Sequence, residues 1–219
     1  MKSVRLLAAF ALIACTADKP AASSDAAPGD SGSRDDITWN LIDEIGSGGR
    51  ADLVAKFGAT NLVDTLIYLV EGEMQPGSVL FPADSIRRVE ITWLDSGARA
   101  RPATIHLNGP ASVWKLPHDI TLGTTLAELE RLNGKPFTVM GFGWDYGGTV
   151  TDWRGGSLAE LKSGSPSVFL RLSPQGDGDS PDHSAVLGEN EFASDLPAMK
   201  RLNPIVDRIV ISYEGPGAN

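Results

Sequence analysis

Apolar and polar residues alternate along several segments of the chain, as they do in half-buried β-strands. The clearest case is 86–94, where Val89, Ile91 and Trp93 alternate with polar residues. Similar patterns predict strands over 65–70, 78–81, 103–107, 112–116, 137–142, 149–153, 168–172 and 205–213. Helical spacing is confined to short segments at about 48–57, 125–133 and 196–202. We therefore expect an α+β fold: an antiparallel sheet with helices packed on one face.

The helix near 125–133 has clear start and stop signals. Thr125 and Glu128 form a capping box, in which each side chain accepts a hydrogen bond from the other residue's backbone N–H. Gly134 suits the left-handed position that follows a helix, and Pro136 prevents the helix from continuing. The leucines between them recur at helical spacing and predict one buried side.

The folded part contains a weak internal repeat. Leu53 and Leu129 are 76 residues apart, as are Gly58 and Gly134, and each pair belongs to a short helix followed by strand-like segments. We interpret this pattern as two related αβ halves, 37–117 and 118–214, the second of which ends in the C-terminal strand, with 215–219 as a tail.

The opening of the second half is also the basis for a resemblance. Residues 120–136, ITLGTTLAELERLNGKP, are similar to the glycine, capped-helix, glycine-lysine-proline opening of two related groups. These are the beta-lactamase-inhibitor-protein fold and the small outer-membrane assembly lipoprotein, both built from tandem α-then-β repeats. The resemblance implies a sheet with helices on one face. It transfers no binding residue, and the stretch 173–183 has no counterpart in it.

The first fifteen residues have the features of an export signal. Lys2 and Arg5 precede the apolar run 6–14, which is too short to span a bilayer, and Cys15 follows at once. The sequence Leu-Ile-Ala-Cys that ends at Cys15 resembles the lipobox of bacterial lipoproteins. That resemblance implies a signal peptide over 1–14 and lipid attachment at Cys15. The alternative is an ordinary secretory signal with an incidental cysteine.

Residues 16–36 contain no large apolar residue. A segment with nothing to bury does not offset its ordering entropy, so we expect 15–36 to be the lipidated cysteine and a flexible tether. Thr16 stands where an Asp would retain such a lipoprotein at the inner membrane, so the resemblance favours the outer membrane of the cell envelope.

Charge and cysteine content narrow the function classes. The chain has 219 residues, with 19 Lys and Arg against 28 Asp and Glu, and a net charge of −9. This balance argues against a nucleic-acid partner, because neutralising phosphates requires a surplus of basic residues. A single cysteine excludes an internal disulfide framework and a multi-cysteine zinc site.

Three motifs suggest catalysis or cofactor binding only weakly. The glycine-rich stretch 46–51 matches a relaxed dinucleotide fingerprint, but the helix that follows is short and precedes hairpin-like strands. The loop 176–183 is rich in Asp and Gly and lacks the bidentate acid that a calcium loop requires. His106, His118 and His183 have no serine or cysteine nucleophile at a recognisable spacing. We therefore assign no catalytic residue, metal ligand or cofactor.

The segment 141–148, GFGWDYGG, is the most unusual part of the chain, with four glycines and three aromatic residues. It predicts either an aromatic binding tip or a hairpin turn whose rings fill the core. Strand alternation favours Met140 and Phe142 in the core, Trp144 at its margin and Tyr146 at the tip. The candidate binding residues are Trp144, Asp145, Tyr146 and Trp153.

These patterns together favour a lipid-anchored envelope protein that binds a protein or a glycan without catalysis, as an inhibitor-like module does. Its membrane contact would be the lipid on Cys15. Two alternatives stay open: an envelope hydrolase whose site the sequence does not reveal, and a structural lipoprotein of an envelope assembly.

Overall fold

The structure is a computed structural model that describes residues 39–46, 48–69, 72–176 and 178–213. The chain divides into two compact units, 1–33 and 34–219, and every described residue belongs to the second. The expected signal peptide, Cys15 and the tether therefore lie outside the described residues, as does the tail 215–219.

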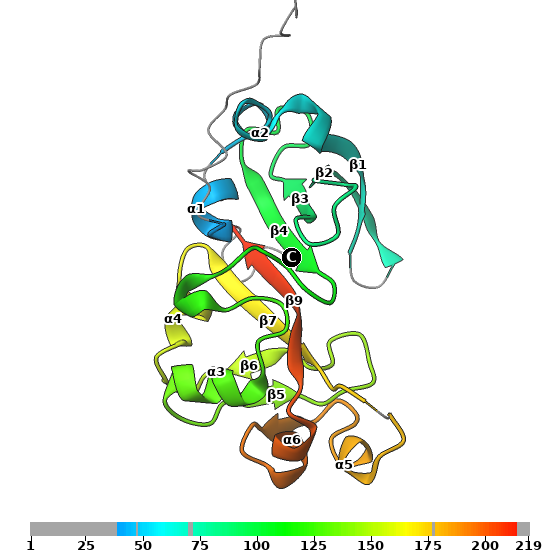
Figure 1. The fold of residues 1–219 in the computed structure, drawn as a ribbon, viewed down its shortest axis with the longest axis vertical. Coiled ribbons are helices and arrows are strands. Elements are labelled where there is room, and N and C mark those ends of the chain that lie inside the picture. Colours follow the sequence, from blue (N-terminus) through cyan, green and yellow to red (C-terminus); the bar gives the residue numbers. More distant parts are fainter. Residues whose placement is uncertain (1–38, 47, 70–71, 177, 214–219) are drawn as a thin grey trace, which may run out of the picture. The chain divides into compact units, whose positions relative to one another are not determined.

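Both predicted halves contribute strands to one six-stranded sheet (Figure 1). Every neighbouring pair in it is antiparallel. Its strands, in spatial order, are β1 (Leu62–Tyr68), β2 (Met74–Leu80), β3 (Val89–Trp93), β4 (Pro102–Asn108), β9 (Ile205–Ser212) and β7 (Ser167–Ser173). A second antiparallel sheet has the order β6 (Val150–Asp152), β5 (Thr138–Met140) and β8 (Glu191–Ala193). The predicted α+β class and antiparallel pairing are confirmed.

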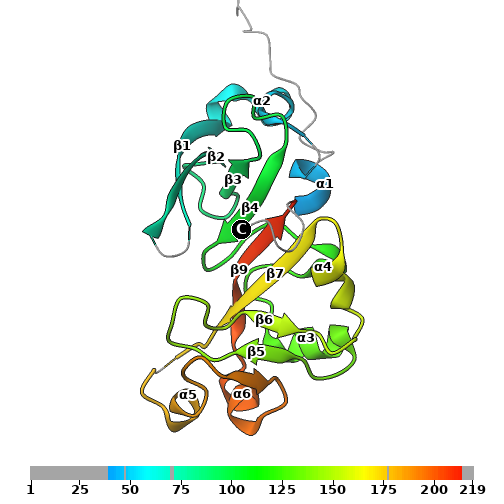
Figure 2. The same ribbon diagram turned by 180° about the vertical axis from the view of Figure 1, so that it is seen from behind.

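Short helices connect these strands. They are α1 (Leu41–Ile45), α2 (Arg50–Phe57), α3 (Leu126–Asn133), α4 (Ala159–Ser163), α5 (Pro181–Ser184) and α6 (Pro197–Leu202), with 3₁₀ turns at Ala59–Asn61 and Pro117–Asp119. The predicted capping box of Thr125 and Glu128 is present at α3, and Gly134 adopts the left-handed conformation after it. Helices α5 and α6 lie side by side next to the start of β9, in the front view and in the view from behind (Figure 2).

One face of the large sheet forms the main core. Ile91, Ile105, Ile211 and Val168 lie in one row across β3, β4, β9 and β7, and all four are buried. Apolar residues of the helices, such as Leu53 and Leu129, are buried in the same cluster. The core thus consists of strand residues that point to the same face of the sheet, together with apolar residues of the helices. This follows from the alternation of side chains between the two faces of a strand.

The opposite face carries two rows of partly exposed side chains, although Val79 and Thr92 on the same face are buried, and we call it the open face. One row across it comprises Glu90, His106, Val210 and Phe169, and the next comprises Asn108, Arg208 and Arg171. These rows bring side chains from β3, β4, β9 and β7 onto one surface.

A β-bulge in β9 adds a charged residue to the open face. Arg171 pairs with Arg208, but Leu172 pairs with Val206, so Asp207 is an extra residue on its strand. Val206 and Ile209 are both fully buried although they are three residues apart. Because a bulge adds one residue to its strand, Val206 and Ile209 can both belong to the core face with Asp207 and Arg208 between them.

Two predictions about local structure were wrong. Residues 112–116 form no strand: Trp114 is fully buried and its Nε1 donates to the Arg87 carbonyl at 2.8 Å. At β5 the core contains Val139 and, just before the strand, Phe137, whereas Met140 is only half-buried. The strand ends at Met140, so alternation does not continue into the turn. Phe142 is buried as predicted, and its N–H bonds to the Val186 carbonyl.

Candidate binding site

The glycine-rich turn 141–148 is held by its own hydrogen bonds. The Trp144 indole Nε1 donates to the Gly141 carbonyl at 2.9 Å, and the Gly147 N–H donates to the Trp144 carbonyl at 3.0 Å. The rings of Trp144 and Tyr146 meet edge to face, with centroids 5.5 Å apart. Because the half-buried Trp144 is fixed by its backbone bond, it supports the exposed ring of Tyr146.

Strand β7 fixes the base of this turn. The Leu172 N–H donates to the Gly148 carbonyl at 2.8 Å, and Gly148 has a φ of +80°. A Cβ at Gly148 would lie 1.9 Å from the Leu172 carbonyl oxygen. A side chain there would collide with the strand, so the close approach of turn and strand requires glycine.

Arg171 of β7 provides a second connection to the turn. Its Nη1 donates to the Asp145 carbonyl at 3.2 Å, next to Tyr146 in the chain. The turn is therefore attached to a strand of the large sheet at Gly148 and at Asp145. Such attachment lowers the entropy that the turn would lose on binding a partner.

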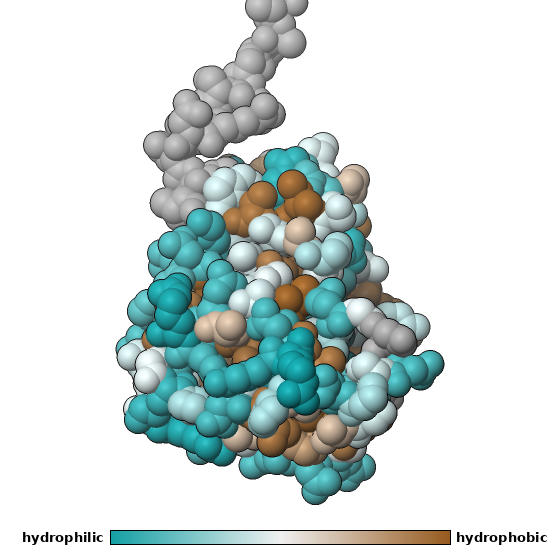
Figure 3. All heavy atoms as spheres, turned by 60° about the horizontal axis from the view of Figure 1, so that its bottom comes forward, coloured by the Kyte–Doolittle hydropathy of each residue, from teal (hydrophilic) through white to brown (hydrophobic). Residues whose placement is uncertain are grey.

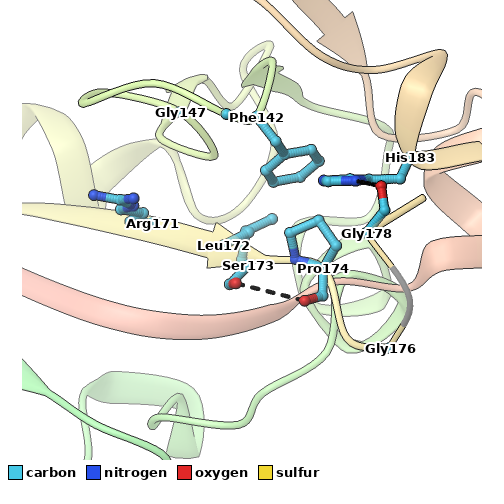
Figure 4. Close-up of a pocket in the computed structure, with 10 residues that line it drawn as sticks. Phe142, Gly147, Arg171, Leu172, Ser173, Pro174, Gly176, Gly178 and His183 are labelled. Atoms are coloured by element: carbon cyan, nitrogen blue, oxygen red, sulfur yellow. Dashed lines mark hydrogen bonds between the residues drawn. The ribbon is translucent and has the colours of Figure 1, made fainter. Parts of the chain in front are cut away.

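A pocket of about 260 Å³ lies beneath the turn, and we call it the turn pocket. Phe142, Leu172, Pro174 and His183 surround its centre in Figure 4, and Arg171 lies to one side under the segment that includes Gly147. Ser173 and four glycines complete the lining. The pocket thus has a mixed apolar and polar lining next to a guanidinium group that is hydrogen-bonded to the turn.

The structure places three of the four candidate binding residues together. Trp144 is half-buried, Asp145 is exposed, and Tyr146 is 46% exposed at the predicted tip. Trp153 is a correction: it is only 3% exposed and packs on Phe137 in the core. Trp153 follows β6 directly, and its carbonyl accepts a bond from the buried Asn133 amide of α3 at 3.0 Å. Cys15 lies outside the described residues.

A second hollow, of about 370 Å³, lies at the ends of β4, β7 and β9, and we call it the strand-end pocket. Asn108, Asp207, Arg208 and Gln175 line it, and Ser173 lines both pockets. Burial raises the pKa of Asp207, although Arg171 and Arg208 act in the opposite direction.

The sequence interpretation missed Arg171, Asp207 and Arg208. The available signal was the spacing of the apolar residues in 205–213, where Val206 and Ile209 interrupt the alternation and so mark the bulge. Nothing in the sequence alone placed Arg171 opposite Arg208, because that register depends on how the strands pair.

The three histidines are in different surroundings. Burial lowers the pKa of His106, and so does Arg208, while Glu90 raises it. His106 Nε2 lies 2.7 Å from the Thr104 hydroxyl. The His183 Nδ1 bonds to the Gly178 carbonyl, and His118 lies 3.7 Å from the exposed Glu160 carboxylate. The described parts of the chain contain no cluster of three or more His, Cys, Asp or Glu residues arranged to hold a metal.

The end of the molecule that carries α5 and α6 has a mostly hydrophilic surface, with apolar residues in small scattered groups (Figure 3). Asp182 of α5 forms two hydrogen bonds with Arg201 of α6, at 2.8 Å and 2.6 Å.

Among the described helices, none has the length and apolar character needed to cross a bilayer.

Comparison with known proteins gives no match to a family model, to a curated protein or to a solved structure. The functional argument therefore depends on the residues of this chain.

Proposed function

We propose that the chain is a lipid-anchored protein of the bacterial cell envelope whose folded part binds a partner through the 141–148 turn without catalysing a reaction. The main support is the exposed ring of Tyr146, which is braced by Trp144 on a turn that β7 holds at two points. Tyrosine provides a large contact area at a low entropic cost, and preorganisation strengthens this effect.

The lipobox-like sequence at Cys15 supports the location of the proposed anchor, with the outer membrane favoured over the inner. Several acyl chains on one cysteine hold a protein at a membrane far better than a single chain does. The Cys15→Ser variant should therefore appear in the soluble fraction or as an unprocessed precursor. Recovery of a processed Cys15→Ser protein with the membranes would contradict the proposed anchor.

Two finer features of the proposed fold complete this view. The helices are expected to cover one face of the sheet, and the two halves are expected to be related, as in inhibitor-like modules. The contribution of both halves to the six-stranded sheet supports the relationship. The separate sheet of β6, β5 and β8 comes wholly from the second half and is a difference between the halves.

The partner is expected to be an envelope protein or a glycan. The test is to apply the full mature chain, in detergent, to arrays of peptides and of envelope glycans. Binding should decrease strongly in Tyr146→Ala and persist in Tyr68→Ala, because Tyr68 is a more exposed tyrosine on the distant strand β1. Binding that is insensitive to Tyr146→Ala would contradict the proposal.

The hydrolase alternative has one observation in its favour, since Ser173 and His183 both line the turn pocket. However, the Ser173 hydroxyl points to the Pro174 carbonyl at 3.5 Å, and His183 Nδ1 bonds to Gly178. Hydrolysis of an envelope ester or glycan that is lost in both Ser173→Ala and His183→Ala would establish this alternative.

A further inference from the structure

Arg171 and Arg208 are direct cross-strand partners on the open face of the large sheet. Like charges directly opposite each other destabilise a sheet. The chain as a whole carries a net charge of −9, so this pair is not part of a general excess of basic residues. A cost of this kind requires a compensating interaction.

The described residues make few direct contacts with the two guanidinium groups. Arg208 forms no side-chain hydrogen bond or ion pair with any of them, and Arg171 forms one hydrogen bond, to the Asp145 carbonyl. The Nε of Arg171 is buried and has no hydrogen-bond partner among them. Most of the donor groups of the two guanidiniums therefore have no hydrogen-bond partner among the described residues.

Asp207 is the acid nearest to this pair in the chain, and it attracts both arginines without forming an ion pair with either one among the described residues. Its Oδ1 is buried without a hydrogen-bond partner in this part of the chain. Burial raises the pKa of Asp207 despite the two nearby positive charges, so its ionised form is poorly stabilised here.

Each of the two arginines lines one of the two pockets. Arg171 lines the turn pocket and Arg208 lines the strand-end pocket, while the hydroxyl-bearing Ser173 lines both. The amide of Asn108, the next residue of the same row, also lines the strand-end pocket. Ser173, which lines both pockets, thus lies between the pocket of Arg171 and the pocket of Arg208.

We propose that Arg171 and Arg208 together bind an oxyanion, a carboxylate or phosphate group, at the junction of the two pockets. Guanidinium groups present planar sets of N–H donors that match the oxygens of such groups, and charge-assisted bonds of this type are strong. The bound anion would remove the repulsion between the two arginines. Ser173 and Asn108 would add neutral hydrogen bonds.

The test uses the full mature chain in detergent, titrated with inorganic phosphate or with acetate at constant ionic strength. The arginine Nε–H signals of Arg171 and Arg208 should shift and saturate in the NMR spectrum, and those of the exposed Arg101 should not. Arg208→Gln should weaken binding about tenfold or more, because it removes charge-assisted hydrogen bonds. Arg208→Lys should retain part of the affinity, and the control Arg101→Gln all of it.

Asp207→Asn gives an independent test, because it asks whether the negative charge of Asp207 weakens phosphate binding. It removes a negative charge beside the site at nearly constant shape, so phosphate should bind several times more tightly. Equal shifts at Arg101, weaker phosphate binding in Asp207→Asn, or affinity unchanged in Arg208→Gln would each overturn the proposal.

Vesicles distinguish the source of the anion. Competition with phosphate by vesicles that contain phosphatidylglycerol, but not by vesicles of phosphatidylcholine alone, would identify a lipid headgroup, and no competition would identify a soluble group. Tyr146→Ala should leave phosphate binding unchanged. The absence of phosphate binding would therefore contradict only this inference, and the absence of binding to the arrays would contradict only the proposed function.

Discussion

The indole of Trp153 packs on the ring of Phe137, with ring centroids 4.9 Å apart and planes inclined by 48°, and both side chains are buried. This contact joins β6 to the start of β5 and lies beside Asn133 of α3, whose amide bonds to the Trp153 carbonyl. It explains why an aromatic residue close to the glycine-rich turn in sequence does not belong to its surface.

Trp153→Ala should therefore lower the free energy of unfolding by about 3–5 kcal/mol, as truncation of a buried aromatic residue does. Denaturant unfolding measures this loss. Tyr68→Ala is the control and should change the free energy by less than about 1 kcal/mol, because Tyr68 is 70% exposed. Equal effects of the two substitutions would contradict the core position of Trp153.

Gly148→Ala should destabilise the protein by about 2 kcal/mol or more, since it combines a left-handed φ with a collision against the Leu172 carbonyl. Gly155→Ala is the matched control. Gly155 also has a positive φ, of +66°, but a Cβ added there would meet no atom within 4 Å, so about 1 kcal/mol is expected. Thermal unfolding of the two variants compares them, and an equal loss would show that the turn is not pressed against β7.

His106 should make stability depend on pH. Burial lowers its pKa below the usual 6.5, so the unfolded chain binds the proton more readily than the folded protein does. Stability should be complete above pH 6.5 and decrease as the pH falls below 6.5 toward the lowered pKa. His106→Gln should flatten this part of the stability profile, measured by denaturant unfolding from about pH 7 to about pH 5. An unchanged slope in His106→Gln would assign the dependence to other groups.

The sequence predicted those parts of the fold that depend on local patterns. The capping signals of α3 are local, and so is the alternation of Val89, Ile91 and Trp93, all of which are buried as expected. Residues 112–116 misled the interpretation because an apolar Trp114 satisfied by the Arg87 carbonyl has the same pattern as a strand residue.

The candidate site was only partly predictable, for a physical reason. The prediction that Tyr146 is exposed is confirmed, although the alternation used to reach it stops where β5 ends at Met140. The proximity of Arg171 to Asp145, and of Arg208 to Arg171, depends on pairing between strands far apart in sequence and on the bulge at Asp207. Sequence pattern does not encode such a register directly.

Tyr146→Ala separates binding from folding. Because the ring is 46% exposed, its loss should cost less than about 1 kcal/mol of unfolding free energy, measured by denaturant unfolding. A loss above about 3 kcal/mol, as for a buried aromatic residue, would make the turn part of the core and remove it as a binding surface.

The most direct test of the central claim is photocrosslinking in intact cells, with a photoreactive phenylalanine analogue placed at position 146 or, as the control, at position 68. Position 146 should give a discrete crosslinked product that position 68 does not give, and Arg171→Ala should reduce its yield by loosening the turn. The absence of a product specific to position 146, or the same product from both positions, would contradict the claim that the 141–148 turn is the binding surface.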